Sequence, residues 1–315
     1  MTVASRRSIH LSTEQPRHGL RGGPALLPVR RLALALATMS ILALTLSAGA
    51  LATRSAGRES LVYEYVRYGP SPLEVADVYP SSAPRSPTVI LVHGGGWRKQ
   101  GQLSRFELES KSLQREGFTV FEINYDQDSP AVPAFPLEPN DVIAATRWAI
   151  ANGARFNANP SDVVLLGGSA GGNLVALAAE QLDAASPGTV RGVVSLSGPM
   201  NFLTLMPMLE EDTISNESFN TSVHRALGFE EGGVFPQAYA EQWSPALHVP
   251  AKSCPNWLIF NSETEFIPLS QAQGLYASLV KAKCKATLQV VPGSEHAFMY
   301  FHRVKPAIFS FIAEQ

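Results

Sequence analysis

The sequence predicts an α/β fold in which a mostly parallel sheet carries helices on both faces. Short apolar runs of strand length recur from residue 88 onward, and segments with helical character separate them. Several of these runs are continuous rather than alternating, which is typical of strands that are buried on both faces. Strands that alternate with helices in this way form β-α-β units, and such units build parallel sheets.

The first 55 residues differ in composition from the rest of the chain. Residues 1–31 hold six arginines against one acid, Glu14, and residues 32–52 contain no charged side chain. Small residues at 48–50 follow the most apolar part, so this segment is interpreted as a secretory signal peptide. An uncleaved membrane anchor is the alternative, because about 20 uncharged residues can span a bilayer. Both interpretations make residues 56–315 an extracytoplasmic domain, secreted or membrane-anchored, whereas a core helix at 32–52 would suit a cytosolic protein.

Composition excludes some classes of partner and cofactor. The chain of 315 residues has 45% hydrophobic residues, 17% charged residues and a net charge of −2. No nucleic-acid partner is expected at this charge. Metal-ligand spacings such as H-E-x-x-H are absent from the sequence, and no metal or other cofactor is expected.

The predicted elements follow one another in a regular order. Two strands joined by a Gly-Pro turn come first, and a segment at 199–245 later interrupts the alternation. Strands are expected at 61–68, 73–79, 88–92, 118–125, 163–166, 190–196, 256–260 and 286–291. Helices are expected at 104–116, 138–152, 174–180, 270–282 and 302–313. Ser104 and Glu107 have the spacing of a capping box for the first of these helices.

The segment at 199–245 is interpreted as a lid or substrate-pocket insertion built from short helices. An insertion at this point would lie over the strand ends, where ligands bind in open α/β sheets. Its methionines and phenylalanines are expected either to line an acyl pocket or to pack over the sheet.

The stretch around Ser169 carries the strongest motif. Gly167 to Gly171 reads G-x-S-x-G, directly after the apolar strand 163–166 and directly before a helix. This context is typical of a nucleophile elbow, in which glycines on both sides of the serine avoid steric collisions. A Gly/Ser turn before an ordinary helix is the alternative interpretation.

A run of three glycines follows the strand 88–92. Acyl transfer requires backbone N–H groups where the tetrahedral oxyanion forms, and glycines let such groups approach a ligand. Gly95 and Gly96 are therefore expected to form an oxyanion hole together with the N–H of Ala170. A flexible glycine loop is the alternative. His93 is expected to brace this loop, and Trp97 to pack or to form a wall of the acyl site.

A serine nucleophile requires a base, and the base requires an anion that fixes its tautomer. His296 and an acid at 263–265 both follow predicted strands, so they are expected to meet Ser169 at one edge of the sheet. The order Ser, acid, His is that of the α/β-hydrolase fold. The other histidines of the domain are expected to lie on the surface or to pack: His224, His248 and His302.

From about residue 60 to residue 313 the sequence resembles the α/β-hydrolase superfamily. The resemblance is to its esterase/lipase branch with H-G-G-G-W and G-x-S-A-G-G motifs, which includes hormone-sensitive-lipase-like carboxylesterases and arylformamidase-like enzymes. Further matching segments are Phe135-Pro136 with Asp141, Asn159 to Asp162, and Ser244-Pro245. The resemblance implies cofactor-free hydrolysis of carboxylic esters with small to medium acyl groups. It also implies Ser169 as nucleophile, His296 as general acid and base, and Gly95, Gly96 and Ala170 as oxyanion hole.

Two positions depart from the family pattern. Thr264 stands where family members usually have the catalytic Asp, and glutamates flank it. Glu265 is favoured over Glu263 as the acid of the triad. Asp126 stands where relatives commonly have Arg, so a structural ion pair is expected to be missing or reversed. Two other functions share the predicted fold: an amide, formamide or peptide hydrolase with the same triad, and a catalytically weak binding protein.

The two cysteines are predicted to form a disulfide. Cys254 and Cys284 each lie just before a predicted strand. If these strands are parallel neighbours, both cysteines lie at the edge of the sheet away from the active site, and export would allow them to bridge.

Overall fold

A computed structural model of the chain describes residues 61–98, 106–129, 131–211, 216–230, 232–250 and 254–315. The chain divides into two units, Met1–Arg58 and Glu59–Gln315, and the fold described below is that of the second unit. The predicted signal or anchor segment lies outside the described residues. Within the described ranges, no helix has both the length and the apolar character that crossing a membrane requires.

The centre of the fold is an eight-stranded sheet. Its spatial order is β1-β2-β4-β3-β5-β6-β7-β8. β2 pairs antiparallel with both β1 and β4, and every other pairing is parallel. This arrangement confirms the predicted α/β fold. The strands are β1 (Tyr63–Arg67), β2 (Val75–Tyr79), β3 (Ser86–Val92), β4 (Thr119–Ile123), β5 (Ala158–Gly168), β6 (Gly192–Leu196), β7 (Asn256–Ser262) and β8 (Ala286–Val291).

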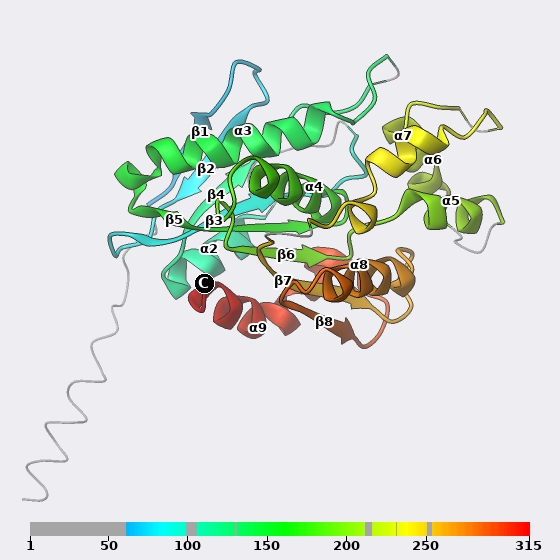
Figure 1. Ribbon diagram of the computed structural model, residues 1–315. Coiled ribbons are helices and arrows are strands. Elements are labelled where there is room, and N and C mark those ends of the chain that lie inside the picture. The colour runs from blue at the N-terminus through cyan, green and yellow to red at the C-terminus, as the bar shows by residue number, and fades with distance from the viewer. Residues whose placement is uncertain (1–60, 99–105, 130, 212–215, 231, 251–253) are drawn as a thin grey trace, which may run out of the picture. The chain divides into compact units, whose positions relative to one another are not determined.

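Helices cover both faces of the sheet. One face packs against α3 (Leu137–Asn152), α4 (Ala170–Ala185) and α8 (Leu269–Lys281), and the other against α2 (Glu107–Glu116) and α9 (Phe301–Ala313). The insertion between β6 and β7 forms three short helices at the carboxyl ends of the strands (Figure 1). They are α5 (Phe202–Glu210), α6 (Glu217–Ala226) and α7 (Gln237–Gln242), followed by the 3-10 turn η2 (Pro245–Leu247). Two further 3-10 turns are η1 (Gly153–Phe156) and η3 (Ala297–Tyr300).

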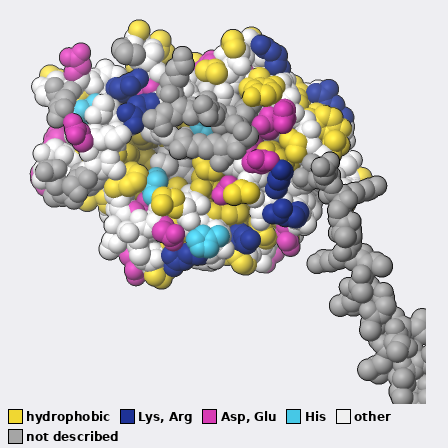
Figure 2. All heavy atoms as spheres, turned by 180° about the vertical axis from the view of Figure 1, so that it is seen from behind, with side chains coloured by type: hydrophobic (Ala, Val, Ile, Leu, Met, Phe, Trp, Pro, Cys, Tyr) yellow, Lys and Arg dark blue, Asp and Glu magenta, His cyan; other side chains and the backbone are white. Residues whose placement is uncertain are grey.

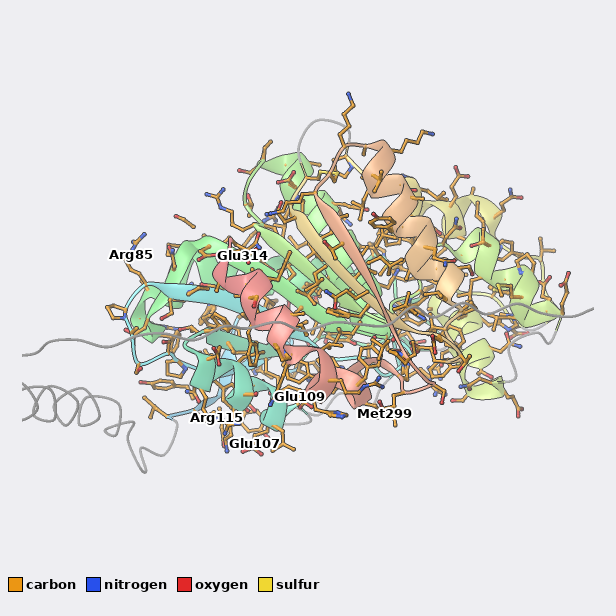
Figure 3. The ribbon with its side chains drawn as sticks, turned by 90° about the horizontal axis from the view of Figure 1, so that it is seen from below. Arg85, Glu107, Glu109, Arg115, Met299 and Glu314 are labelled. Atoms are coloured by element: carbon orange, nitrogen blue, oxygen red, sulfur yellow. A yellow bond between two sulfur atoms is a disulfide. The ribbon has the colours of Figure 1, made fainter. Side chains whose placement is uncertain are left out.

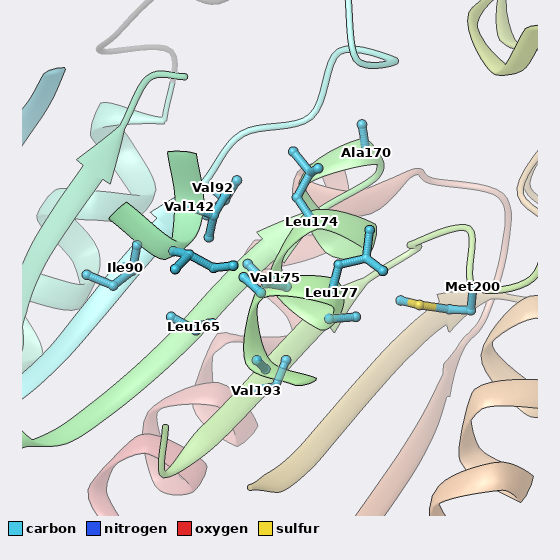
Figure 4. Packing of buried hydrophobic residues seen from close by; sticks show 14 of the residues in the cluster. Ile90, Val92, Val142, Leu165, Ala170, Leu174, Val175, Leu177, Val193 and Met200 are labelled. Carbon is cyan, nitrogen blue, oxygen red and sulfur yellow. The ribbon is translucent and has the colours of Figure 1, made fainter. Parts of the chain in front are cut away.

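Two hydrophobic clusters, one on each face of the sheet, explain why the strands are apolar at successive positions. Ile90 and Leu165 belong to the cluster under α3 and α4, which Figure 4 shows from close by. Their neighbours Val89 and Leu166 belong to the cluster under α2 and α9. Complete burial of each such side chain contributes about 1.5–3 kcal/mol. A polar side chain on either face of these strands would therefore be buried under helices.

Several predicted boundaries were wrong. The helix predicted at 174–180 is longer at both ends, since α4 runs from Ala170 to Ala185. Glu107 is the first residue of α2, so it cannot be the third residue of a capping box headed by Ser104, a residue outside the described ranges. Buried Glu122 of β4 holds the start of α2 instead, because its carboxylate accepts the backbone N–H of the N-cap residue Phe106 at 3.0 Å and the hydroxyl of Ser110, within the helix, at 2.8 Å. β5 begins five residues before the predicted strand, since Ala158 already pairs with Ser86 of β3.

The predicted disulfide is confirmed. Cys254 and Cys284 are bonded, with their Cα atoms 5.9 Å apart. They precede β7 and β8, which are parallel neighbours. The bridge therefore joins these two strands at their amino ends.

Candidate active site

Five strands bring the candidate site together at one edge of the sheet. β3 leads into the glycine run at 94–96, β5 into Ser169, β6 into Ser197, β7 into Glu265 and β8 into His296. Because these strands are parallel and adjacent in the order β3-β5-β6-β7-β8, their carboxyl ends lie side by side. Residues that span 203 positions of the sequence thereby reach one region of space.

Ser169 occupies a strained turn between β5 and α4. Its backbone angles are φ 57° and ψ −127°, a conformation that costs roughly 1–3 kcal/mol and is typical of functional sites. A Cβ on Gly167 would lie 2.2 Å from the carbonyl oxygen of Gly171, and a Cβ on Gly171 would lie 2.3 Å from that of Val92. Both glycines are therefore required by the tight contact between the turn, the helix and β3.

Glu265 contacts the imidazole of His296. One carboxylate oxygen, Oε2, is bonded to Nδ1 of His296, and the other, Oε1, accepts the backbone N–H of Ser262 at 2.9 Å. The carboxylate is fully buried, whereas the imidazole is 18% exposed. Glu263 is exposed and accepts the N–H of Gly293 at 3.2 Å, and the hydroxyl of Thr264 donates to the carbonyl of Gly293. Of the two flanking glutamates, the one that the sequence favoured is the one that orients the histidine.

Ser197 is a contact of the site that the sequence analysis missed. Its hydroxyl donates to Oε1 of Glu265 at 2.6 Å, lies 2.7 Å from the hydroxyl of Tyr300, and accepts the backbone N–H of Ala297 at 3.1 Å. Burial, and to a lesser extent the charge of Glu265, raise the pKa of Tyr300, so the phenol stays neutral. The sequence does contain a signal for this contact, because Ser197 is a polar residue that directly follows a buried parallel strand.

The glycine run approaches the serine closely. A Cβ on Gly94 would lie 2.7 Å from the carbonyl oxygen of Gly168, and Gly95 and Gly96 have φ angles of 131° and 67°. Ala170 is the first residue of α4, where a backbone N–H has no acceptor within the helix. The expected oxyanion donors thus flank the turn that carries the serine.

His93 braces the glycine run, as expected. Its Nδ1 lies 2.7 Å from the carbonyl oxygen of Gly94, its Nε2 lies 3.2 Å from Oδ1 of Asn124, and its ring stacks on Tyr125. Trp97 is buried against Phe135 and Phe202 and does not line the cavity described next, so it packs.

A cavity of about 380 Å³ contains both Ser169 and His296 in its wall. The glycine run forms one side, and α6 of the insertion forms another through Asn216, Ser218, Phe219 and Ser222. Further aromatic walls come from Phe106, Phe266 and Phe298. The insertion therefore contributes to the cavity, although Met200, Phe202 and Met206 pack in the core instead.

Three histidines and Asp126 lie outside the cavity. His224 is buried against Phe229, whereas His248 and His302 are exposed and bond to backbone carbonyls. Asp126 accepts the hydroxyl of Ser71, and its backbone N–H donates to Asp141, so a carboxylate stands where relatives have an arginine. Among the residues that the structure describes, no group of three or more His, Cys, Asp or Glu side chains could hold a metal ion.

The sheet order, the strained serine after β5 and the Glu265–His296 pair define an α/β-hydrolase. The chain belongs to the BD-FAE family, which it matches over residues 76–279.

Curated relatives support this assignment. Esterase LipQ of Mycobacterium tuberculosis is 28% identical over 255 residues, which are 74% of this chain and 56% of the relative. Carboxylesterase NlhH of the same species is 26% identical over 231 residues, 70% of this chain and 69% of the relative. Hormone-sensitive lipase of Bos taurus is 31% identical over 153 residues, 45% of this chain and 20% of the relative. The chain spans little more than half the length of LipQ and of LipM, a probable carboxylic ester hydrolase.

Solved structures share the fold. Esterase B of Lactobacillus rhamnosis has a TM-score of 0.64 at 20% identity, covering 90% of this chain and 97% of that chain. A hyperthermophilic esterase of Pyrobaculum calidifontis has a TM-score of 0.65 at 20% identity, covering 90% and 92%. At this identity the likeness establishes the architecture alone.

Proposed function

We propose that the protein is a serine carboxylesterase that cleaves esters of small to medium acyl groups through an acyl-enzyme. The contact between Glu265 and His296, in the wall of the cavity that Ser169 also lines, carries this proposal. The cavity volume of about 380 Å³ suits a small ester. The names of the relatives, which are esterases and lipases, favour ester over amide substrates.

In the proposed mechanism, the Ser169 hydroxyl attacks the ester carbonyl while Nε2 of His296 takes its proton. Glu265 accepts the Nδ1–H, which fixes the tautomer and stabilises the imidazolium. The N–H groups of Gly95, Gly96 and Ala170 stabilise the oxyanion. The imidazolium then protonates the leaving alcohol, and water, deprotonated by the same imidazole, hydrolyses the acyl-serine.

Replacing the nucleophile tests this proposal. Ser169→Ala removes the attacking oxygen, so turnover of 4-nitrophenyl acetate should fall by at least about 10³-fold. The melting temperature should stay close to that of the wild type, which separates lost chemistry from lost folding. A fluorophosphonate probe should label the wild type at Ser169. Full turnover by the folded variant would contradict the assignment, and matched ester and anilide substrates would distinguish an esterase from an amidase.

We also propose that residues 56–315 act outside the cytoplasm, as a secreted domain or one attached to the membrane through residues 32–52. The arginine-rich start with its apolar segment, and the disulfide between Cys254 and Cys284, support this location. Fractionation of cells that express the full chain tests it. Activity found in the cytosol with free thiols at both cysteines would contradict it.

A further inference from the structure

Arg98 is a cation in the wall of the candidate active site. It follows the glycine run, and its Nη2 donates to the hydroxyl of Ser218 on α6 at 2.8 Å. Its Nε lies 3.8 Å from the position that a Cβ on Gly96 would take, so the guanidinium lies beside the proposed oxyanion-binding loop. Nε itself is buried without a hydrogen-bond partner among the described atoms. The charge of Arg98 is thus met by one neutral hydroxyl.

The charge of Arg98 is not balanced within the described part of the site. No Asp, Glu or Lys is among the described residues that line the cavity. The charge of Arg98 lowers the pKa of Asp128. This carboxylate is buried and is already paired with Arg225 at 3.3 Å. Burial raises the pKa of Asp128 to about 6 against the influence of both arginines, so it is ionised above that pH. Asp128 is thus in direct contact with Arg225 and is influenced by Arg98 only through space.

Nearby Glu138 does not supply the missing negative charge. It accepts the backbone N–H of Asp128 at 3.1 Å and is completely buried. Burial, reinforced by the charge of Asp128, raises its pKa well above the ordinary value, which favours its neutral form. Among the described residues, no carboxylate forms an ion pair with Arg98, whereas Arg225 is paired with Asp128.

Resting on the proposed esterase function, we propose that this site selects esters that carry a second, anionic group, a carboxylate in the simplest case, which pairs with Arg98. A guanidinium recognises a carboxylate through directed, charge-assisted hydrogen bonds. The bond to Ser218 holds the Arg98 side chain against α6 in the wall of the cavity, so the charge is positioned before substrate arrives.

The position of Arg98 beside Gly96 allows the anionic group to belong either to the acyl chain or to the alcohol, and two substrate pairs distinguish these sources. The acyl pair is mono-4-nitrophenyl adipate with 4-nitrophenyl hexanoate. The alcohol pair is 3-acetoxybenzoate with 3-acetoxybenzamide. In the wild type, kcat/KM for the charged member of at least one pair should exceed that for the neutral member, and in Arg98→Gln this ratio should fall about tenfold.

Arg85→Gln is the matched control. Arg85 is exposed, bonds to Asn159 and precedes β3, whereas Arg98 follows that strand. Figure 3 shows Arg85 well apart from Met299, a residue of the cavity wall. The ratio should remain at its wild-type value in Arg85→Gln. Ratios that do not depend on Arg98 in either substrate pair would overturn the inference.

A binding measurement separates this inference from the proposed function. With Ser169→Ala, calorimetry should show tighter binding of the adipate monoester than of the hexanoate ester, and adding Arg98→Gln should remove the difference. Arg98-dependent binding without Ser169-dependent turnover would refute the esterase and keep the anion site. Ser169-dependent turnover with neither rate nor binding dependent on Arg98 would keep the esterase and refute the anion site.

Discussion

At the scale of single residues, a glutamate contacts the histidine where the family pattern places an aspartate one position earlier. Its additional methylene lets the carboxylate of Glu265 reach Nδ1 of His296 from a point further along the loop after β7. A longer side chain has more rotamers to lose, and the contacts with Ser197 and the backbone N–H of Ser262 hold it in one of them.

Substitution of the two glutamates tests this assignment. Glu265→Gln keeps the shape but removes the charge that stabilises the imidazolium, so kcat should fall by roughly 10²–10⁴-fold. Glu263→Gln is the matched control, because its exposed side chain contacts Gly293 rather than His296. Steady-state kinetics on one ester measures both. A larger loss in Glu263→Gln than in Glu265→Gln would reverse the roles.

Ser197 is a positioning residue in this arrangement. Ser197→Ala removes the hydroxyl that donates to Glu265, so kcat should fall about tenfold while KM changes little, because the substrate cavity is untouched. Ser195→Ala is the control: this buried serine lies on β6, two residues before Ser197, and bonds to the carbonyl of Gly172 instead. Equal losses of kcat in the two variants would mean that Ser197 only packs.

The sequence predicted Ser169, His296 and the glycine run because each combines a motif with a strand end. It did not decide whether Glu263 or Glu265 contacts His296. The two glutamates are two positions apart in one loop and have the same side chain, so only the path of the backbone distinguishes them. Ser197 and Arg98 have no motif: their roles come from contacts with residues 68 and 120 positions away, respectively. Such contacts depend on the tertiary fold.

At the scale of elements, the insertion and the disulfide shape the region around the sheet edge. α6 is capped by Asn216, whose side chain accepts the N–H of Phe219 at 3.0 Å. This cap fixes the end of α6 that faces the cavity. The bridge between Cys254 and Cys284 holds β7 and β8 together at their other ends.

Removal of the disulfide should lower stability without direct damage to catalysis. The two cysteines are 30 residues apart in sequence, and a closed loop of that length is expected to contribute about 3 kcal/mol by constraining the unfolded chain. Cys254→Ser with Cys284→Ser should therefore lower the free energy of unfolding in urea by that amount, with kcat retained well below the melting transition. Wild type under reducing conditions should match the variant. An unchanged unfolding midpoint would show that the bridge does not stabilise the fold.

Element types were predictable because each strand is a compact apolar run and each helix lies between two of them. The starting points of α2 and β5 were not. The start of α2 is set by Glu122, a buried carboxylate on a neighbouring strand, and the start of β5 is set by pairing with β3. The sequence near each starting point does not indicate that Glu122 or β3 is the partner.

At the scale of the whole molecule, one described face shows how the surface charges are distributed. On the face shown in Figure 2, acidic and basic side chains are interspersed with hydrophobic and neutral ones. This distribution agrees with the net charge of −2 and offers no extended basic surface on the part of that face that is described. The notable charges are buried carboxyl groups, which link stability to pH.

Asp141 provides the clearest case. Burial, with smaller contributions from Asp126 and Glu74, raises its pKa to about 7, although the backbone N–H of Asp126 stabilises the charged form. The unfolded chain releases this proton near pH 4 and the folded protein only near pH 7, so stability is lost as pH rises across that interval. Asp141→Asn keeps an acceptor for Asp126 but does not titrate.

The variant Asp141→Asn should therefore gain stability relative to the wild type as pH rises. The difference in unfolding free energy should move in its favour by more than about 1 kcal/mol between pH 5 and pH 8. Urea unfolding of both proteins at the two pH values measures this. Parallel pH dependences would show that Asp141 does not hold its proton in the folded state.

The overall architecture was predictable because alternation of apolar runs and helices allows few topologies. The sheet order β1-β2-β4-β3 was not predicted. The antiparallel edge depends on whether β2 pairs with β3 or with β4, and the sequence of β2 suits both. The N-terminal 60 residues keep their interpretation as an expectation, because they lie outside the described part of the chain.

The bridge between β7 and β8 has a mechanical consequence. Glu265 and His296 follow β7 and β8, which the disulfide joins at their amino ends. Ser169 follows β5, which is separated from β7 by β6. When thermal motion shears the sheet, we expect Glu265 and His296 to move together. Such motion would then vary the separation between Ser169 and His296, and in the proposed mechanism it would affect the proton transfer rather than the orientation of the imidazole.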